Sequence, residues 1–246
     1  MKTENYDNEL SLWIEKEKTT SELSNVVSRL ILECSTELVM FRNRMTHLSI
    51  SEILNLHDYA AKFVKQNISV HQTLPLAKAI LEMGIKNSKI DLGKLAYEWN
   101  KENKSDDELN NFIKDKLSIY SNTDNNLSPK DVILYGFGRI GRLVARELFL
   151  QDNAGGQLRL RAIVTRSNSE KDITKRASLL RTDSVHGVFT GTVKEDFENK
   201  ALIINGRSVK MIAAKSPDSI DYTEYGINDA LVINNTGVVR DKEALS

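Results

Sequence analysis

One stretch past the midpoint of the chain constrains the fold more than any other. The segment DVILYGFGRIGRLVARELF (131–149) passes from a short apolar run into a G-x-G-x-x-G turn, and then into apolar residues at helical spacing. A strand, a glycine turn and a helix in this order open a doubly wound parallel sheet. Gly136 permits the sharp turn, Gly138 lets the backbone approach a pyrophosphate, and Gly141 lets the helix pack close to the sheet. The turn is therefore typical of a dinucleotide site, with phosphates at the helix N-terminus.

The residues after this turn have the period of strands. LRLRAIV (158–164) alternates in polarity, and ALIIN (201–205) is joined by Asn205-Gly206 to RSVKMIAA (207–214), which predicts a hairpin with a type I′ turn. ALVIN (230–234) predicts another buried strand. We expect residues 128–246 to form a Rossmann-type α/β domain with a partial doubly wound sheet.

The first half of the chain has a different composition. Only Gly84 and Gly93 of the twelve glycines precede residue 128, and apolar residues recur at spacings of three and four. We expect residues 1–127 to form an all-α extension, whose last residues overlap a polar linker at 121–130. The first predicted helix has one apolar face, formed by Leu23, Val27, Leu30, Cys34, Leu38, Phe41 and Met45. Four further helices are predicted to begin at Ser49–Glu52, at Thr73 and Pro75 (ending at Gly84), at Ser88–Asp91 and at Ser105–Glu108.

Charge and cysteine content exclude several classes of protein. Lys+Arg and Asp+Glu both number 34, so the net charge gives no reason to expect binding to nucleic acid or membrane. The N-terminus lacks a signal-peptide pattern, and no apolar run reaches the roughly 18 residues of a membrane span. A single cysteine, Cys34, excludes an internal disulfide or a CxxC metal site, and no His or acidic residues have metal-ligand spacing. We expect a cytoplasmic protein without a metal.

The string GFGRIGR resembles the nucleotide-binding turn of glyceraldehyde-3-phosphate dehydrogenases, in which an Asn commonly stands at the place of Tyr135. Four further segments resemble that family in the same order: DSVHG (183–187), FTGTV (189–193), LIINGRSVKMIAAKSP (202–217) and NNTGVVRDKE (234–243). The resemblance covers residues 130–246. Residues 1–127 resemble the helical N-terminal extension of a longer bacterial branch of the family.

The resemblance implies a set of cofactor-binding residues and a partner. Arg139 and Ile140 would contact the pyrophosphate, Lys215 would lie near the adenine, and Thr236 and Gly237 would line the nicotinamide side. The family also implies a homo-oligomer, a tetramer, that acts on glyceraldehyde 3-phosphate and inorganic phosphate in glucose metabolism. The complete set of expected cofactor-binding residues is Gly136, Phe137, Gly138, Arg139, Ile140, Gly141, Thr165, Arg166, Lys215, Thr236 and Gly237.

The end of the second strand departs from the family pattern. NAD-specific members have an Asp there that accepts the ribose 2′-hydroxyl, whereas this chain has Thr165 followed by Arg166. A carboxylate repels a 2′-phosphate, and a guanidinium can bind one with paired N–H donors. We therefore expect NADP, or both cofactors. The alternative is a solvated Arg166 and NAD bound through its phosphates.

The catalytic residues of the family are absent from the sequence. The family forms a thioester on a Cys in an S-C-T-T-N segment, helped by a His, and no such segment occurs here. Cys34 lies on an apolar helical face and is expected to pack, and we expect His186 to hold the DSVHG loop rather than act as a base. His47, His57 and His71 are expected to be surface or packing residues. We expect the N-terminal part of a longer enzyme, inactive alone and without catalytic residues of its own.

Two other functions fit the same residues. The chain could be a non-catalytic NAD(P)-sensing module whose helical half binds a partner. It could also belong to an erythrose-4-phosphate dehydrogenase. A Cys in an SCTTN-like context downstream would select an enzyme in which that thiolate attacks the aldehyde, NAD(P)⁺ accepts hydride and phosphate releases the acyl group.

Overall fold

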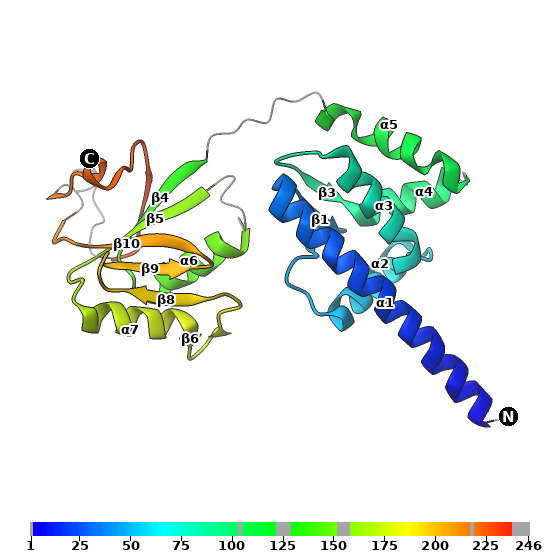
Figure 1. The fold of residues 1–246 in the computed structure, drawn as a ribbon, viewed down its shortest axis with the longest axis horizontal. Helices are drawn as coiled ribbons and strands as arrows, with labels where there is room; N and C mark the ends of the chain where they lie inside the picture. Colours follow the sequence, from blue (N-terminus) through cyan, green and yellow to red (C-terminus); the bar gives the residue numbers. More distant parts are fainter. Residues whose placement is uncertain (1, 103–104, 122–128, 152–157, 217–218, 238–246) are drawn as a thin grey trace. The chain divides into compact units, whose positions relative to one another are not determined.

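A computed structural model describes residues 2–102, 105–121, 129–151, 158–216 and 219–237 (Figure 1). The chain divides into two compact units, Met1–Asn126 (unit 1) and Leu127–Ser246 (unit 2). The division falls within the predicted linker at 121–130, of which residues 122–128 lie outside the described residues. None of the helices described is long and apolar enough to cross a bilayer.

Unit 1 is mainly helical, as predicted. Its helices are α1 (Lys2–Cys34), α2 (Ile50–Val64), α3 (Val70–Met83), α4 (Leu92–Glu102) and α5 (Leu109–Ser121), with a short 3₁₀ turn at Asp106–Glu108. Ser49 and Glu52 form the predicted capping box of α2, and Gly84 ends α3 with a φ of 62°. The helices share one apolar core, in which the rings of Trp99 and Phe112 lie 5.0 Å apart.

The prediction of a helix that runs through Leu38 and Met45 is wrong beyond Cys34, where α1 ends. Glu37–Met40 forms strand β1, which pairs with β2 (Asn43–Arg44) and with β3 (Lys89–Asp91), so unit 1 contains a three-stranded sheet. Ser35 leaves the helix with a φ of 51°. The Thr36 hydroxyl then donates to the Ile85 carbonyl at 2.6 Å. The apolar residues of 38–40 are consecutive and all buried, which suits a strand and which the spacing of three and four concealed.

Two predicted helix starts are also displaced. Helix α3 begins at Val70 and not near Thr73, because the Gln72 side chain accepts the Ser69 N–H at 3.0 Å and closes the first turn. Residues 89–91 form β3 before α4 begins, and Asp91 accepts the Lys94 N–H at 3.0 Å. The carboxylate that caps α4 thus lies three residues later than the predicted Ser88.

Unit 2 is the predicted Rossmann-type α/β fold. Its sheet has the order β11-β4-β5-β10-β9-β8, in which β11, β4, β5 and β10 are parallel and β9 pairs antiparallel with both β10 and β8. The bounds are β4 Lys130–Tyr135, α6 Arg139–Gln151, β5 Leu158–Thr165, α7 Glu170–Arg181, β6 Thr182–Asp183, β7 Gly187–Val188, β8 Val193–Asp196, β9 Ala201–Ile204, β10 Arg207–Ala213, a 3₁₀ turn Tyr222–Tyr225 and β11 Leu231–Asn234. Figure 1 shows α7 running beside β8.

The hairpin predicted at Asn205-Gly206 is confirmed, with φ values of 47° and 78° at these residues, as a type I′ turn requires. Strand β11, predicted to be buried, is instead an edge strand of the sheet. Leu231 and Val232 on it are 46% and 43% exposed. The apolar run predicts a strand correctly but does not tell an edge from a centre, because that depends on which strand pairs on its far side.

The sheet is covered on both faces. Val132 and Leu134 of β4 pack into the cluster that includes α6 and α7 residues, whereas Ile133 and Tyr135 pack into a second cluster with Ile227. Alternate residues of one strand therefore reach two cores, as in parallel sheets buried on both sides. Because β11, β4 and β5 pair in parallel, their carboxyl ends lie at one edge of the sheet.

Candidate functional site: a glycine-lined cavity

The carboxyl ends of β4 and β11 form the point at which the sheet changes winding direction. The chain leaves β4 toward β5 on one side, while β11 pairs on the other. The Gly136 N–H donates to the Val164 carbonyl at 2.9 Å, and the Asn235 N–H donates to the Tyr135 carbonyl at 2.7 Å. The glycine turn is thus fixed to both neighbouring strand ends, where open α/β sheets bind ligands.

A cavity of about 370 Å³ opens at this place. It lies within unit 2 and is large enough to take part of a nucleotide. Its walls come from the ends of β4, β5, β10 and β11 and from helix α7. The lining residues are Tyr135, Gly136, Phe137, Gly138, Val164, Thr165, Arg166, Arg176, Ala214, Lys215 and Thr236.

The three glycines of the turn have different surroundings. Gly136 has a φ of 91°, which favours glycine. A Cβ on Gly141 would lie 2.4 Å from the Gly136 carbonyl oxygen, so the first turn of α6 packs directly against the loop. A Cβ on Gly138 would meet no protein atom within 4 Å. The backbone at Gly138 is therefore open to a ligand, whereas Gly141 is required by the protein itself.

Most of the predicted cofactor residues meet at this cavity. Gly136, Phe137, Gly138, Thr165, Arg166, Lys215 and Thr236 line it, whereas Arg139, Ile140, Gly141 and Gly237 are beside it and are not lining residues. Ile140 is 60% exposed on the first turn of α6. Phe137 is only 2% exposed, and its ring packs in the core, so it offers a ligand little more than its backbone.

The cavity wall is cationic. Arg166, Arg176 and Lys215 line it, and none of the lining residues given above is acidic. Arg166 and Lys215 are exposed, and within the described part of the chain neither side chain has a hydrogen bond or an ion pair. Three cations and no acidic residue in the lining favour an anionic ligand.

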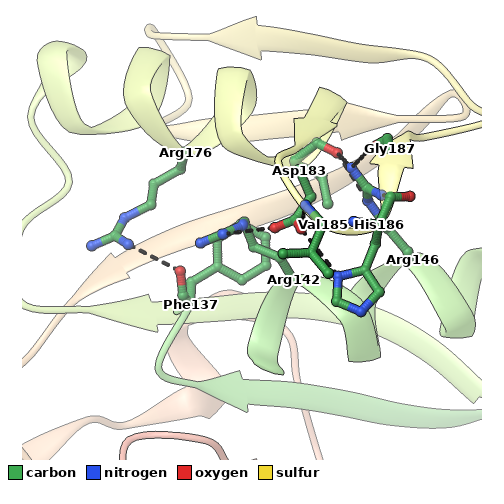
Figure 2. A network of polar contacts seen from close by, with 9 residues as sticks. Phe137, Arg142, Arg146, Arg176, Asp183, Val185, His186 and Gly187 are labelled. Atoms are coloured by element: carbon green, nitrogen blue, oxygen red, sulfur yellow. Dashed lines mark hydrogen bonds and ion pairs between the residues drawn. The ribbon is translucent and has the colours of Figure 1, made fainter. Parts of the chain in front are cut away.

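Arg176 was not predicted as a site residue. It lies on α7, next to the core position Ala177, and its Nη1 donates to the Phe137 carbonyl at 2.9 Å (Figure 2). Its Nε is buried and has no hydrogen-bond partner among the described residues. The guanidinium thus holds the glycine turn by its hydrogen bond to the Phe137 carbonyl. The sequence signal for this role is the place of Arg176 beside the apolar face of the helix that follows the second strand of unit 2.

Thr165 and its loop are fixed by hydroxyl groups. Thr165 is 6% exposed, and its hydroxyl donates to the Ser167 carbonyl at 2.7 Å. The Ser167 and Ser169 hydroxyls both donate to the Asp172 carboxylate, at 2.6 and 2.7 Å, and these hydrogen bonds lower the pKa of Asp172. These hydrogen bonds hold the loop that carries Arg166, and Ser169 caps α7 because its hydroxyl also accepts the Asp172 N–H at 3.3 Å.

A buried ionic network holds the DSVHG segment against α6 (Figure 2). The Asp183 carboxylate accepts hydrogen bonds from the Val185 and His186 N–H groups at 3.0 and 3.1 Å, and from His186 Nδ1 at 3.0 Å. Arg142 Nη2 lies 3.2 Å from the same carboxylate. These donors hold the pKa of Asp183 far below its usual range, with the backbone N–H of Val185 the largest cause. His186 thus holds its loop, in agreement with the predicted role.

Arg146 of α6 also contacts the DSVHG segment. Its Nη2 donates to the carbonyls of Leu180 and Gly187, at 2.7 and 3.1 Å. Arg142 and Arg146 of α6 therefore hold this helix against α7 and the segment that follows α7.

The single thiol lies in unit 1. Cys34 is 9% exposed at the end of α1, and burial raises the pKa of its thiol. A buried thiol with a raised pKa is a poor nucleophile, so the predicted packing role agrees with its position. His57 is buried as well, whereas His47 and His71 are exposed, as expected for packing and surface residues. Among the described residues, no group of three His, Cys, Asp or Glu could hold a metal ion.

Comparison with known proteins shows which family unit 2 resembles in sequence. Residues 130–242 match the family model for glyceraldehyde 3-phosphate dehydrogenase, NAD binding domain. A glyceraldehyde-3-phosphate dehydrogenase-like protein of Pseudomonas aeruginosa is 43% identical over 201 residues, which are 80% of this chain and 43% of that protein. The glyceraldehyde-3-phosphate dehydrogenases of Thermotoga maritima and Monascus purpureus are both 35% identical, over 46% and 48% of this chain and 31% and 32% of their own lengths. The chain thus spans less than half the length of these relatives.

The Pseudomonas protein also resembles unit 1. Unit 2 begins at Leu127, so a match over 201 residues must include much of the helical unit. The other two matches, of 112 and 118 residues, have about the length of unit 2 alone. Residues 130–242 of this chain belong to the NAD-binding domain family of the glyceraldehyde-3-phosphate dehydrogenases.

Proposed function

We propose that unit 2 binds NAD(P) with the pyrophosphate over Gly138 and the N-terminus of α6. The observation that carries this proposal is the open space at Gly138, where a Cβ would meet nothing, at the mouth of a cavity with a cationic wall. The free N–H groups of the first turn of α6 add a positive partial charge there. When bound, the nicotinamide supplies a hydride acceptor, and the described residues bind and orient it.

The adenosine end of the site favours NADP. Arg166 and Lys215 line the cavity, no lining residue is acidic, and the Asp172 carboxylate in the first turn of α7 accepts hydrogen bonds from two serine hydroxyls. A 2′-phosphate would gain charge-assisted hydrogen bonds there, whereas a 2′-hydroxyl would gain few. Tyr135 stabilises this side by donating its hydroxyl to the Lys215 carbonyl at 2.9 Å.

We further propose that the chain supplies the cofactor-binding part of a phosphorylating glyceraldehyde-3-phosphate dehydrogenase. The family of unit 2 supports this assignment. The thiol nucleophile would come from residues outside this sequence, because Cys34 is buried in unit 1. Glyceraldehyde 3-phosphate and phosphate would be its substrates in a homo-oligomer. The chain alone should then show no aldehyde oxidation, and turnover that disappears in Cys34→Ser would contradict this role.

Titration calorimetry of the chain with NAD and NADP tests cofactor binding. Gly138→Val should abolish binding of both, because its side chain would occupy the pyrophosphate position, while the circular dichroism spectrum stays close to that of the wild type. Ser208→Val is the control. Ser208 is exposed on β10, where a β-branched residue suits the strand, and it is not a lining residue of the cavity. Equal affinity in the Gly138→Val variant would contradict the proposed site.

A second function, an NAD(P)-sensing module, predicts the same binding but a different consequence. Cofactor would then change the affinity of unit 1 for a partner. An erythrose-4-phosphate dehydrogenase would differ only in substrate, and a full-length protein assayed with both aldehydes separates it from the main proposal.

A further inference from the structure

The N-terminal part of α1 is an exposed helix that the rest of unit 1 does not cover. All residues from 6 to 16 are exposed, whereas Leu23, Val27 and Leu30, farther along the same helix, are buried in the core. Figure 1 shows α1 continuing toward the N-terminus beyond the helices that it packs against in this unit. The helix is therefore anchored at one half and open at the other.

The exposed half carries an apolar stripe. Tyr6, Leu10, Trp13 and Ile14 are 68%, 44%, 44% and 41% exposed. Spacings of four and three residues place Tyr6, Leu10 and Trp13 on one face of a helix, with Ile14 beside them. We call these four residues the α1 stripe. Large side chains at this spacing are those that a second helix covers in a coiled coil.

The charges along the stripe indicate which helix covers it. Glu9 and Lys16 are seven residues apart, so they lie along the same edge of the stripe. In an antiparallel pair of identical helices, Leu10 of one copy meets Trp13 of the other. Glu9 then lies opposite Lys16 of the second copy, and the two-fold axis repeats both contacts. In a parallel pair, Glu9 would face the position of Ile14, and no such charge pairs would form.

We propose that a second copy of this chain packs antiparallel on the α1 stripe, with Leu10 against Trp13 and Glu9 paired with Lys16. The proposal is independent of cofactor binding, because all of its residues lie on α1. Helix formation itself is secured by the anchored half of α1, so association does not have to order the chain first. With few apolar residues in each copy, the interface is small and the association weak.

Sedimentation of the full chain between about 1 and 100 μM measures the association, in a range suited to a small interface. Tryptophan fluorescence emission shows whether the two copies associate through the α1 stripe. Trp99 is 8% exposed and contributes a constant signal, whereas Trp13 is 44% exposed and becomes covered in the pair. We expect the emission to shift to shorter wavelength as dimer forms. A dimer that leaves the emission unchanged would overturn the proposal, and so would a monomer at every concentration.

Charge exchange tests the antiparallel pairing. Glu9→Lys and Lys16→Glu should each weaken self-association on the order of tenfold, because like charges then face each other twice. A mixture of the two variants should associate at least as well as the wild type, since each Lys then faces a Glu. The double variant should also regain wild-type affinity. Equal affinities of all variants, or no recovery in the mixture, would overturn the pairing.

A control separates this interface from others. Lys62→Glu reverses an exposed charge on α2 and should leave the association unchanged. Trp13→Lys should abolish it, because a charge would replace the central apolar contact. Emission of the wild type that is already at short wavelength and independent of concentration would show that this chain covers its own stripe, and would overturn the proposal.

Discussion

The two units bury their apolar residues in different ways. Unit 1 has one large cluster to which every helix contributes, whereas the sheet of unit 2 separates two smaller clusters. Unit 1 also has the short sheet β2-β1-β3, but its described residues form one apolar core. The sheet of unit 2 brings its strand ends to one edge, and the glycine turn leaves a cavity there. The proposed ligand site therefore lies at the strand ends of the unit whose sheet divides the core.

The buried polar groups differ as well. In unit 1, His57 lies with Nδ1 2.8 Å from the Ile53 carbonyl and Nε2 2.8 Å from the Thr73 hydroxyl, a pattern that suits a neutral ring. In unit 2, most of the buried polar groups are charged: Asp183 faces Arg142, and the buried Asp131 lies 2.7 Å from Arg159. Removal of one partner should therefore harm unit 2 more, since it leaves a buried charge without compensation.

Asp183→Ala tests this difference with the largest expected effect. It leaves Arg142 without its carboxylate, and the Val185 and His186 N–H groups without their acceptor. We expect the melting temperature of unit 2 to fall on the order of 10 °C. Hydrogen exchange read by mass spectrometry should show faster exchange in α6 and α7 and no change in α1–α5.

The matched control in unit 1 is Thr73→Val, which removes the partner of His57 and introduces no buried charge. Its effect should be smaller. An equal loss in the two variants would mean that ionic and neutral buried groups stabilise the two units to the same degree.

Glycine substitutions should separate the structural role from the binding role within the turn. Gly141→Ala places a Cβ 2.4 Å from the Gly136 oxygen, which is backbone and cannot move aside freely. We expect a loss of about 1–3 kcal/mol in the free energy of unfolding. Gly138→Ala meets no protein atom and should leave that free energy nearly unchanged. Denaturant unfolding measures both, and similar losses would contradict the assigned surroundings.

The two units should also respond to acid in different ranges. Burial lowers the pKa of His57, so the folded unit 1 favours the neutral ring. As the pH falls below about 6.5, the unfolded state binds the proton first and unit 1 loses stability. The hydrogen bonds to Asp183 lower its pKa, so unit 2 keeps this contribution until the pH falls below about 4.

Unfolding followed by hydrogen exchange between pH 7 and 3 measures these ranges. Unit 1 should weaken first, and His57→Gln should remove the part of its pH dependence between about pH 6.5 and 5. A pH profile of unit 1 that is the same with and without His57 would show that other groups control it.

The sequence predicts the parts of the molecule that local spacing determines. The glycine turn, the Asn205-Gly206 hairpin and the Ser49–Glu52 capping box follow from short-range geometry, and all three are present. The sequence does not predict strand β1 because its partner β3 lies about 50 residues away, and its other partner, β2, is only two residues long. Arg176 was missed for the same kind of reason, since its contact with the turn joins residues distant in sequence.

The smallest expected effect concerns the cations that line the cavity of unit 2. On the surface of unit 1, by comparison, Lys116 forms an ion pair with Glu98, with 2.9 Å between Nζ and Oε2. Arg166 lines the cavity without such a partner among the described residues. Arg166→Ala should weaken NADP binding about tenfold and leave NAD nearly unchanged, because only the 2′-phosphate can accept its paired donors. Thr165→Asp should shift the preference toward NAD.

The measurement is the ratio of the two dissociation constants, with Lys194→Ala as a control. Lys194 is an exposed cation on β8 that is not a lining residue of the cavity, so it matches the loss of one charge without touching the site. Because a general charge effect would act equally in both variants, only a change confined to Arg166→Ala and to NADP supports the assigned contact. Equal losses for both cofactors would mean that Arg166 supports the loop rather than the phosphate. No change for either would mean that the side chain points into solvent and that the preference for NADP is wrong.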